Sequence, residues 1–186
     1  PFKDIAEYLL ANGIASYRYD KRNYSYPETL NEKSTVEEET INDAVNAALY
    51  FKNNPEYKGY QIIILGHSQG AYMMPKIAEK AQVSKSVFMA GNARPLQDLL
   101  VEQYEYLHSM DPAKVPAEAV QEVKKQVAFL NSPQFNLNSP ATELPLGQPA
   151  PYWKYLKDYN QLKEVKKIKA PMFFAQGGRD YQVTEK

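Results

Sequence analysis

Residues 61–70 read Gln-Ile-Ile-Ile-Leu-Gly-His-Ser-Gln-Gly, and this stretch decides the fold expected for the chain. Its first half is apolar and β-branched, which is typical of a strand buried on both faces. Two glycines then flank a central serine, and residues 71–81 continue with apolar side chains at helical spacing. The sequence therefore predicts a strand, a sharp turn centred on Ser68, and a helix.

A serine in this strand–turn–helix setting has the pattern of a nucleophile elbow, G-x-S-x-G. Glycines at positions 66 and 70 are expected because the turn is tight and side chains there would collide. The turn would hold Ser68 in a strained backbone conformation, with its Oγ projecting above the sheet. The backbone N–H of Gln69, at the start of the helix, would donate to an oxyanion. The alternative is a chance match in a loop, which the flanking pattern disfavours.

The length, charge and cysteine content of the chain exclude several kinds of partner and functional site. The 186 residues amount to one domain, and an apolar content of 44% is enough for a core. The 22 basic and 22 acidic residues balance, so nothing indicates nucleic acid or an anionic membrane as a partner. No apolar run approaches the ~20 residues of a membrane span. The absence of cysteine excludes disulfides, thiolate metal sites and cysteine nucleophiles, and no metal or organic cofactor is expected.

Hydrophobic periodicity predicts further elements on either side of the serine turn. They are a helix over residues 1–12, a strand over 14–19, a helix over 34–53 opened by two overlapping capping boxes, and a strand over 85–90. Pro75 should kink the helix that follows Ser68 because it lacks a backbone donor. Alternating strands and helices of this length predict a parallel sheet with helices on both faces.

Residues 92–167 are too long for a simple crossover between strands. Helices are expected over residues 95–110, 116–130 and 152–167, with a loop at 131–151 that is rich in Pro, Asn and Ser. We interpret this segment as a helical cap inserted into a core made of residues 1–91 and 168–186. The side chains expected to contact a substrate are Asn92, Tyr104, Leu107, Tyr152, Trp153 and Tyr155. The alternative is a bundle that only packs on the sheet.

Three further stretches carry a resemblance to a known family. Residues 13–22, 90–95 and 171–180 lie in the order, and around the strands, expected of bacterial α/β-hydrolases. Within that superfamily the chain is most similar to the dienelactone-hydrolase and prolyl-oligopeptidase-like esterases. The resemblance implies an α/β fold: an incomplete parallel-sheet α/β-hydrolase core with a helical cap insertion.

The resemblance also implies a triad in the chain order serine, acid, histidine. Asp180 follows an apolar strand in a Gly-Gly-Arg-Asp turn and is the expected acid, since no acidic residue follows the strand before it in residues 91–94. Aspartate also favours turns for its own backbone hydrogen bonds, so a structural turn residue is the alternative. His67 adjoins Ser68 but should point elsewhere, and His108 precedes Asp180, so neither histidine fits the base.

The family pattern therefore implies that the chain is an internal fragment without its general-base histidine. It also implies a missing early loop with the second oxyanion donor, and a missing strand between residues 14–19 and 61–65. An unpaired edge there would recruit a second copy into a homodimer, or residues 1–34 would be locally disordered. The sequence does not fix the compartment, and a cytoplasmic location is the default expectation.

The function expected of the parent protein is that of a serine hydrolase. It would cleave small carboxylic esters or related acyl substrates through an acyl-enzyme on Ser68. A peptidase of the prolyl-oligopeptidase type, a thioesterase and an acyl transferase remain open, because the serine turn does not separate them. From a different class, the chain alone would be a catalytically incompetent fragment.

Overall fold

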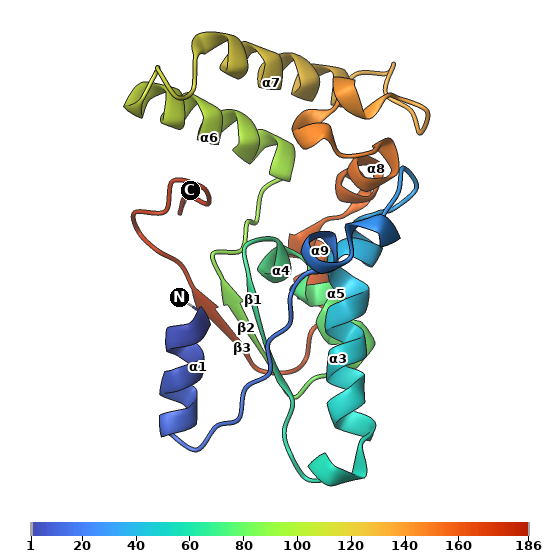
Figure 1. The fold of residues 1–186 in the computed structure, drawn as a ribbon, viewed down its shortest axis with the longest axis vertical. Coiled ribbons are helices and arrows are strands. Elements are labelled where there is room, and N and C mark those ends of the chain that lie inside the picture. Colours follow the sequence, from blue (N-terminus) through green and yellow to red (C-terminus); the bar gives the residue numbers. More distant parts are fainter. Residues whose placement is uncertain (1, 186) are drawn as a thin grey trace.

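The sheet of this protein has three parallel strands. The computed structural model describes residues 2–185. Residues 1 and 186, which belong to the expected core segments 1–91 and 168–186, lie outside that range. The strands are β1 (Ile63–His67), β2 (Lys85–Met89) and β3 (Met172–Ala175), in the order β1-β2-β3. Three of the four expected strands are therefore present, and Figure 1 shows them at the centre of the molecule.

The two helices expected before β1, over residues 1–12 and 34–53, are present within the described residues, and short helical turns that were not expected accompany them. They are α1 (Phe2–Ala11), α2 (Arg22–Ser25), a π-helical turn η2 (Glu37–Ile41) and α3 (Asn42–Asn53), with 3-10 turns η1 (Pro27–Thr29) and η3 (Pro55–Tyr57). Of the two expected capping boxes, the one at Thr35 forms: its backbone N–H and hydroxyl both donate to Glu38, at 2.7 and 2.8 Å. The Ser34 hydroxyl instead accepts from the Asn31 N–H at 3.0 Å. Burial raises the pKa of Glu38, but the bonds from Thr35 more than offset it, so the pKa lies below its ordinary value.

The helix after Ser68 is broken as Pro75 predicts. It divides into α4 (Gln69–Tyr72) and α5 (Met74–Ala81), and Pro75 is the second residue of α5. Both helices cover one face of the sheet, where Ala71 and Met74 pack on Phe88. The short helix α4 therefore lies directly on the carboxyl end of the sheet.

Residues 92–167 fold as a helical segment that leads away from the sheet and returns to it (Figure 1). Its elements are α6 (Leu96–Met110), α7 (Ala117–Leu130), the 3-10 turns η4 (Ala141–Glu143) and η5 (Pro145–Gly147), α8 (Ala150–Asp158) and α9 (Gln161–Val165). The single helix expected over residues 152–167 is wrong, because Tyr159 is extended and Asn160 starts a new helix by accepting from the Lys163 N–H at 2.9 Å.

One buried apolar cluster runs from the sheet-side helices into the helical segment. Ile41 and Met73 lie in it beside Leu130, Leu144 and Trp153, all fully buried. Burying such side chains stabilises the fold by about 1.5–3 kcal/mol each. The helical segment thus shares the core of α3 and α5 and is held to it by the same hydrophobic effect.

The expected strand over residues 14–19 does not form. Within residues 2–185 no strand pairs with the free edge of β1. Residues 14–19 have no regular secondary structure and are exposed, with the Tyr17 ring centroid 5.1 Å from that of Phe51. A strand needs a neighbouring strand for its hydrogen bonds, and the backbone of residues 15–19 bonds to no other backbone in the described range. The free edges of β1 and β3 could pair with a second copy of the chain. The expected self-association therefore stays a prediction, which light scattering over a concentration series would test.

The expectation of helices on both faces is only partly met. The face opposite α4 and α5 carries Ile63, Leu65 and Phe173, and Phe173 is 64% exposed. Helix α1 approaches this side through Phe2, whose ring lies 5.6 Å from His67, but none of its residues is buried. The described residues therefore cover one face of the sheet and leave much of the other open.

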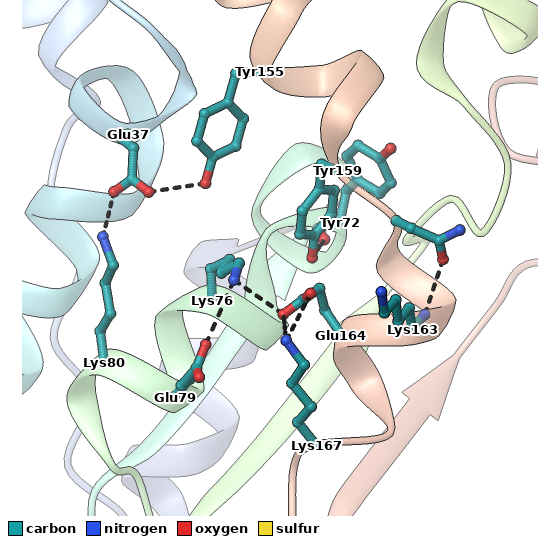
Figure 2. A network of polar contacts seen from close by, with 11 residues as sticks. Glu37, Tyr72, Lys76, Glu79, Lys80, Tyr155, Tyr159, Lys163, Glu164 and Lys167 are labelled. Atoms are coloured by element: carbon teal, nitrogen blue, oxygen red, sulfur yellow. Dashed lines mark hydrogen bonds and ion pairs between the residues drawn. The ribbon is translucent and has the colours of Figure 1, made fainter.

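Polar contacts join the returning helices to the sheet-side helices (Figure 2). Lys76 Nζ lies 3.0 Å from Glu164 on α9, and the Tyr155 hydroxyl donates to Glu37 at 2.9 Å, while Glu37 also pairs with Lys80. Hydrogen bonds from Lys167 and Lys76 hold the pKa of Glu164 below its ordinary value. This carboxylate is therefore favoured in its charged form by the folded chain.

We predict that Glu164→Gln lowers the free energy of unfolding at pH 7 by up to about 1 kcal/mol. A carboxyl whose pKa is lowered by folding stabilises the protein at any pH above its ordinary pKa of 4.5. This stabilisation is lost as the pH falls through the lower pKa of the folded state. Urea unfolding at several pH values measures the difference. Glu79→Gln is the control, because Glu79 lies farther from Lys76, at 3.7 Å, and is more exposed. A Glu164→Gln effect that persisted at low pH would contradict the electrostatic explanation.

Candidate active site

Ser68 stands in a strained turn between β1 and α4. Its backbone angles, φ 53° and ψ −118°, are rare for a residue with a side chain and cost of order 1–3 kcal/mol. Two bonds hold it there: the Ser68 N–H donates to the Met89 carbonyl at 2.9 Å, and the Tyr72 N–H donates to the Ser68 carbonyl at 2.8 Å. The strain is thus supported by the neighbouring strand and by the helix that follows.

The glycines around Ser68 have different roles. A Cβ at Gly66 would lie 2.5 Å from the Gly70 carbonyl oxygen, so only glycine lets the strand and helix approach this closely. A Cβ at Gly70 would meet nothing within 4 Å, so the expected collision there is wrong. Gly91, after β2, is needed for packing, since a Cβ would lie 2.8 Å from the Ala71 Cβ. The turn therefore rests on close approaches at Gly66 and Gly91.

The groups needed for acyl chemistry are free at the turn. Ser68 is half-buried, and its hydroxyl makes no hydrogen bond to any residue in the range 2–185. The backbone N–H of Gln69 is the first of α4 and has no acceptor among the same residues, as expected at a helix start. A hydroxyl and an adjacent free N–H at the carboxyl edge of a parallel sheet can attack a carbonyl carbon and bind its oxygen.

Neither histidine bonds to Ser68. His67 is exposed at the end of β1, on the open face of the sheet, with its ring against Phe2. His108 lies on α6, and its Nδ1 is 2.7 Å from the Val115 carbonyl in the turn between α6 and α7. The structure thus keeps both histidines at other contacts, as their sequence positions indicated.

Asp180 lies in the turn after β3 and caps it. Its Oδ1 accepts from the backbone N–H groups of Gln182 and Val183, at 2.9 and 3.1 Å. Its Oδ2 has only a long contact, 3.4 Å, from the Gln176 side chain. Asp180 therefore has the structural turn role that the sequence offered as the alternative to a catalytic one. Its Oδ2 can still accept a further hydrogen bond.

The side chain of Gln69 is the polar centre that the sequence reasoning missed. Its Oε1 accepts from Lys21 Nζ at 2.8 Å and from the Thr40 hydroxyl at 3.2 Å, and its Nε2 donates to Glu39 at 3.1 Å and to the Tyr152 hydroxyl at 2.6 Å. Burial and the charge of Glu39 raise the pKa of Tyr152, so this hydroxyl stays protonated. No spacing along the chain indicates that these residues meet.

The six side chains expected to contact a substrate lie in different surroundings. Tyr152 reaches Gln69, beside Ser68, and Tyr155 bonds to Glu37. Trp153 is fully buried, and its indole N–H donates to the Pro145 carbonyl at 3.0 Å. It is therefore part of the core, where no ligand reaches it. Tyr104 and Leu107 lie half-buried along α6.

The sixth, Asn92, is buried after β2, and its side-chain N–H donates to the Arg94 carbonyl at 2.8 Å. It lines a cavity of about 260 Å³ at the carboxyl ends of β2 and β3, together with Phe88, Leu99 and Phe174. A second cavity, of about 210 Å³, lies between Glu39 and Tyr152. Ligands of open α/β sheets bind beyond the carboxyl ends of strands, which the first cavity adjoins, but Ser68 lines neither of the two.

Within residues 2–185 there is neither a cluster of metal-ligating side chains nor a helix that could span a membrane. No three histidine or acidic side chains come together within residues 2–185 as ligands for a metal ion would. The helices in the same range are all too short or too polar to cross a lipid bilayer.

The chain is similar in sequence to a known protein. The chain is 37% identical, over 188 aligned positions, to a protein named Esterase EstD of Thermotoga maritima. The alignment covers all of this chain and 42% of the relative, so the chain spans less than half the length of that protein. No protein-family model matches the chain.

We predict that Gly66→Ala destabilises the fold by about 1–3 kcal/mol or prevents folding, because the new methyl would overlap backbone atoms that cannot rotate away. Gly70→Ala is the matched control, since its methyl meets open space inside a helix and should change stability by less than about 1 kcal/mol. Thermal unfolding followed by circular dichroism compares the two. Equal effects of the two changes would contradict the packing described for the turn.

Proposed function

We propose that this chain is the nucleophile-bearing part of a serine hydrolase that cleaves carboxylic esters. The observation that carries the proposal is the strained Ser68 turn, with a free hydroxyl next to the free Gln69 N–H at the carboxyl edge of a parallel sheet. The 37% identity to a protein named as an esterase supports ester substrates over peptides and thioesters. An α/β-hydrolase core formed by residues 1–91 and 168–186, with residues 92–167 as its cap, belongs to the same proposal.

In the proposed reaction Ser68 Oγ attacks the acyl carbon of a small ester while its proton passes to a histidine base. The Gln69 N–H donates to the oxyanion of the tetrahedral intermediate. The base then returns the proton to the leaving alcohol, and water hydrolyses the acyl-enzyme by the reverse sequence. Asp180 would orient the histidine through Oδ2, the oxygen that its turn leaves nearly free.

The proposal places the base outside residues 1–186. His67 and His108 are both held at other contacts, and neither bonds to Ser68. The same observation favours a second candidate, that the 186-residue chain alone is catalytically incompetent. Its turnover of p-nitrophenyl acetate should accordingly be far below that of the full-length gene product, and equal rates would mean that His67 or His108 is the base.

We predict that a fluorophosphonate probe labels the full-length gene product at Ser68. Ser68→Ala should abolish labelling and ester hydrolysis, because the hydroxyl is the attacking group. Mass spectrometry of the labelled peptide checks the position. His67→Ala is the control: it alters the neighbouring side chain on the open face and should keep the label. Undiminished labelling of Ser68→Ala would overturn the proposal.

We predict that Asp180→Asn in the full-length gene product lowers kcat by ~10³–10⁴ and changes KM little. Asparagine can still accept from the two backbone N–H groups that Oδ1 now binds, so the turn should persist while the charge that orients a histidine is lost. Steady-state kinetics with p-nitrophenyl acetate and an unchanged melting temperature check this. An unimpaired kcat would place the acid elsewhere.

A further inference from the structure

The Gln69 side chain makes every hydrogen bond that a primary amide can make. A glutamine amide has two N–H donors and an oxygen with two lone pairs. Here both donors and both lone pairs are used, by Glu39 and Tyr152 on one side and by Lys21 and Thr40 on the other. A fully bonded amide next to the proposed nucleophile is therefore fixed in one orientation.

The charges around the amide select glutamine over other residues of its size. Turned by 180°, the amide would set its NH₂ group against the Lys21 ammonium and its oxygen against the Glu39 carboxylate. Glutamate at this position would face Glu39 with a like charge, and leucine would leave buried polar groups without partners. Lys21 and Glu39 also pair with each other, at 3.3 Å, so the two charges flank the amide as a unit.

The four partners come from three separate parts of the fold. Lys21 precedes α2, and its neighbour Arg22 is anchored to Asp43 of α3, with Nε 3.0 Å from Oδ2. Glu39 and Thr40 belong to the π-helical turn η2. Tyr152 comes from α8 in the returning helical segment, and its side chain is almost fully buried. The residue that follows Ser68 is thus tied to the early loop, to the helix beside it and to the segment of residues 92–167.

We propose that Gln69 is a positioning residue whose side chain holds the start of α4 in the reactive arrangement, and that Tyr152 makes this arrangement depend on the docked helical segment. The inference rests on the proposed function of Ser68. Its physical basis is that the Ser68 hydroxyl and the Gln69 N–H belong to adjacent residues of a strained turn. A displacement of about 1 Å at such a site can lower the rate by as much as ~10²-fold.

The experiment measures kcat, KM and melting temperature for variants of the full-length gene product acting on p-nitrophenyl acetate. Gln69→Leu should lower kcat by about 10- to 100-fold with KM changed less than about threefold, because ground-state binding does not use the amide. Tyr152→Phe removes one of the four bonds and should lower kcat by a smaller factor in the same direction. In the double variant the two effects on kcat should be less than multiplicative, because both act through one amide.

Tyr159→Phe is the matched control. It removes a tyrosine hydroxyl that also reaches α4 from the end of α8, donating to the Tyr72 carbonyl at 2.9 Å, but it is not one of the four partners of Gln69. Its kcat should equal that of the unmodified protein even if its melting temperature falls.

Two results would overturn the inference: an unchanged kcat in Gln69→Leu, or equal losses of kcat in Tyr152→Phe and Tyr159→Phe. If Gln69→Leu does not fold, the comparison of the two tyrosine variants decides alone. Activity that survives Ser68→Ala would instead refute the proposed function, so the two failures are distinguishable.

Discussion

The close approach of β1 to α4 is the constraint on which the rest of the structure depends. Gly66 lies so near the Gly70 carbonyl that the chain must reverse within the intervening residues, and Ser68 adopts a positive φ as a result. The reversal sets α4 against the carboxyl end of the sheet, where Gly91 must in turn leave room for Ala71. Strain at one residue is held by the packing of two glycines and by the ladder bond from Ser68 to β2.

The helical segment of residues 92–167 is joined to this turn in two ways. Its buried side chains complete the apolar cluster of α3 and α5, which supplies the larger part of its stabilisation. Its polar side chains then select the orientation in which it docks: Glu164 pairs with Lys76, Tyr155 bonds to Glu37, and Tyr152 bonds to Gln69. The hydrophobic contacts are not directional, so these polar contacts determine which residues of α8 and α9 lie near Ser68.

Local patterns predicted the elements well where the chain itself supplies the partner. The capping box at Thr35 and the break before Pro75 depend on residues near in sequence. The three strands of the sheet each have another of these strands to pair with. Residues 14–19 have the same strand-like composition but no neighbouring strand, and they remain unpaired. The helix expected over 152–167 is divided because Asn160 caps a second start, a local bond that helical periodicity does not reveal.

The sequence by itself determined the serine turn, because the glycine spacing, the β-branched run before it and the apolar helix after it act within twenty residues. Through the family resemblance it also pointed to Asp180 as the expected acid and to no histidine in the expected chain order. Only the tertiary structure decided that Gln69 is bonded to Lys21, Glu39, Thr40 and Tyr152, that Trp153 is a core residue, and that Gly70 meets no obstacle. The physical reason is range: strand and turn preferences are local, whereas the hydrogen bonds of Gln69 join residues up to 83 positions apart and depend on how the helices pack.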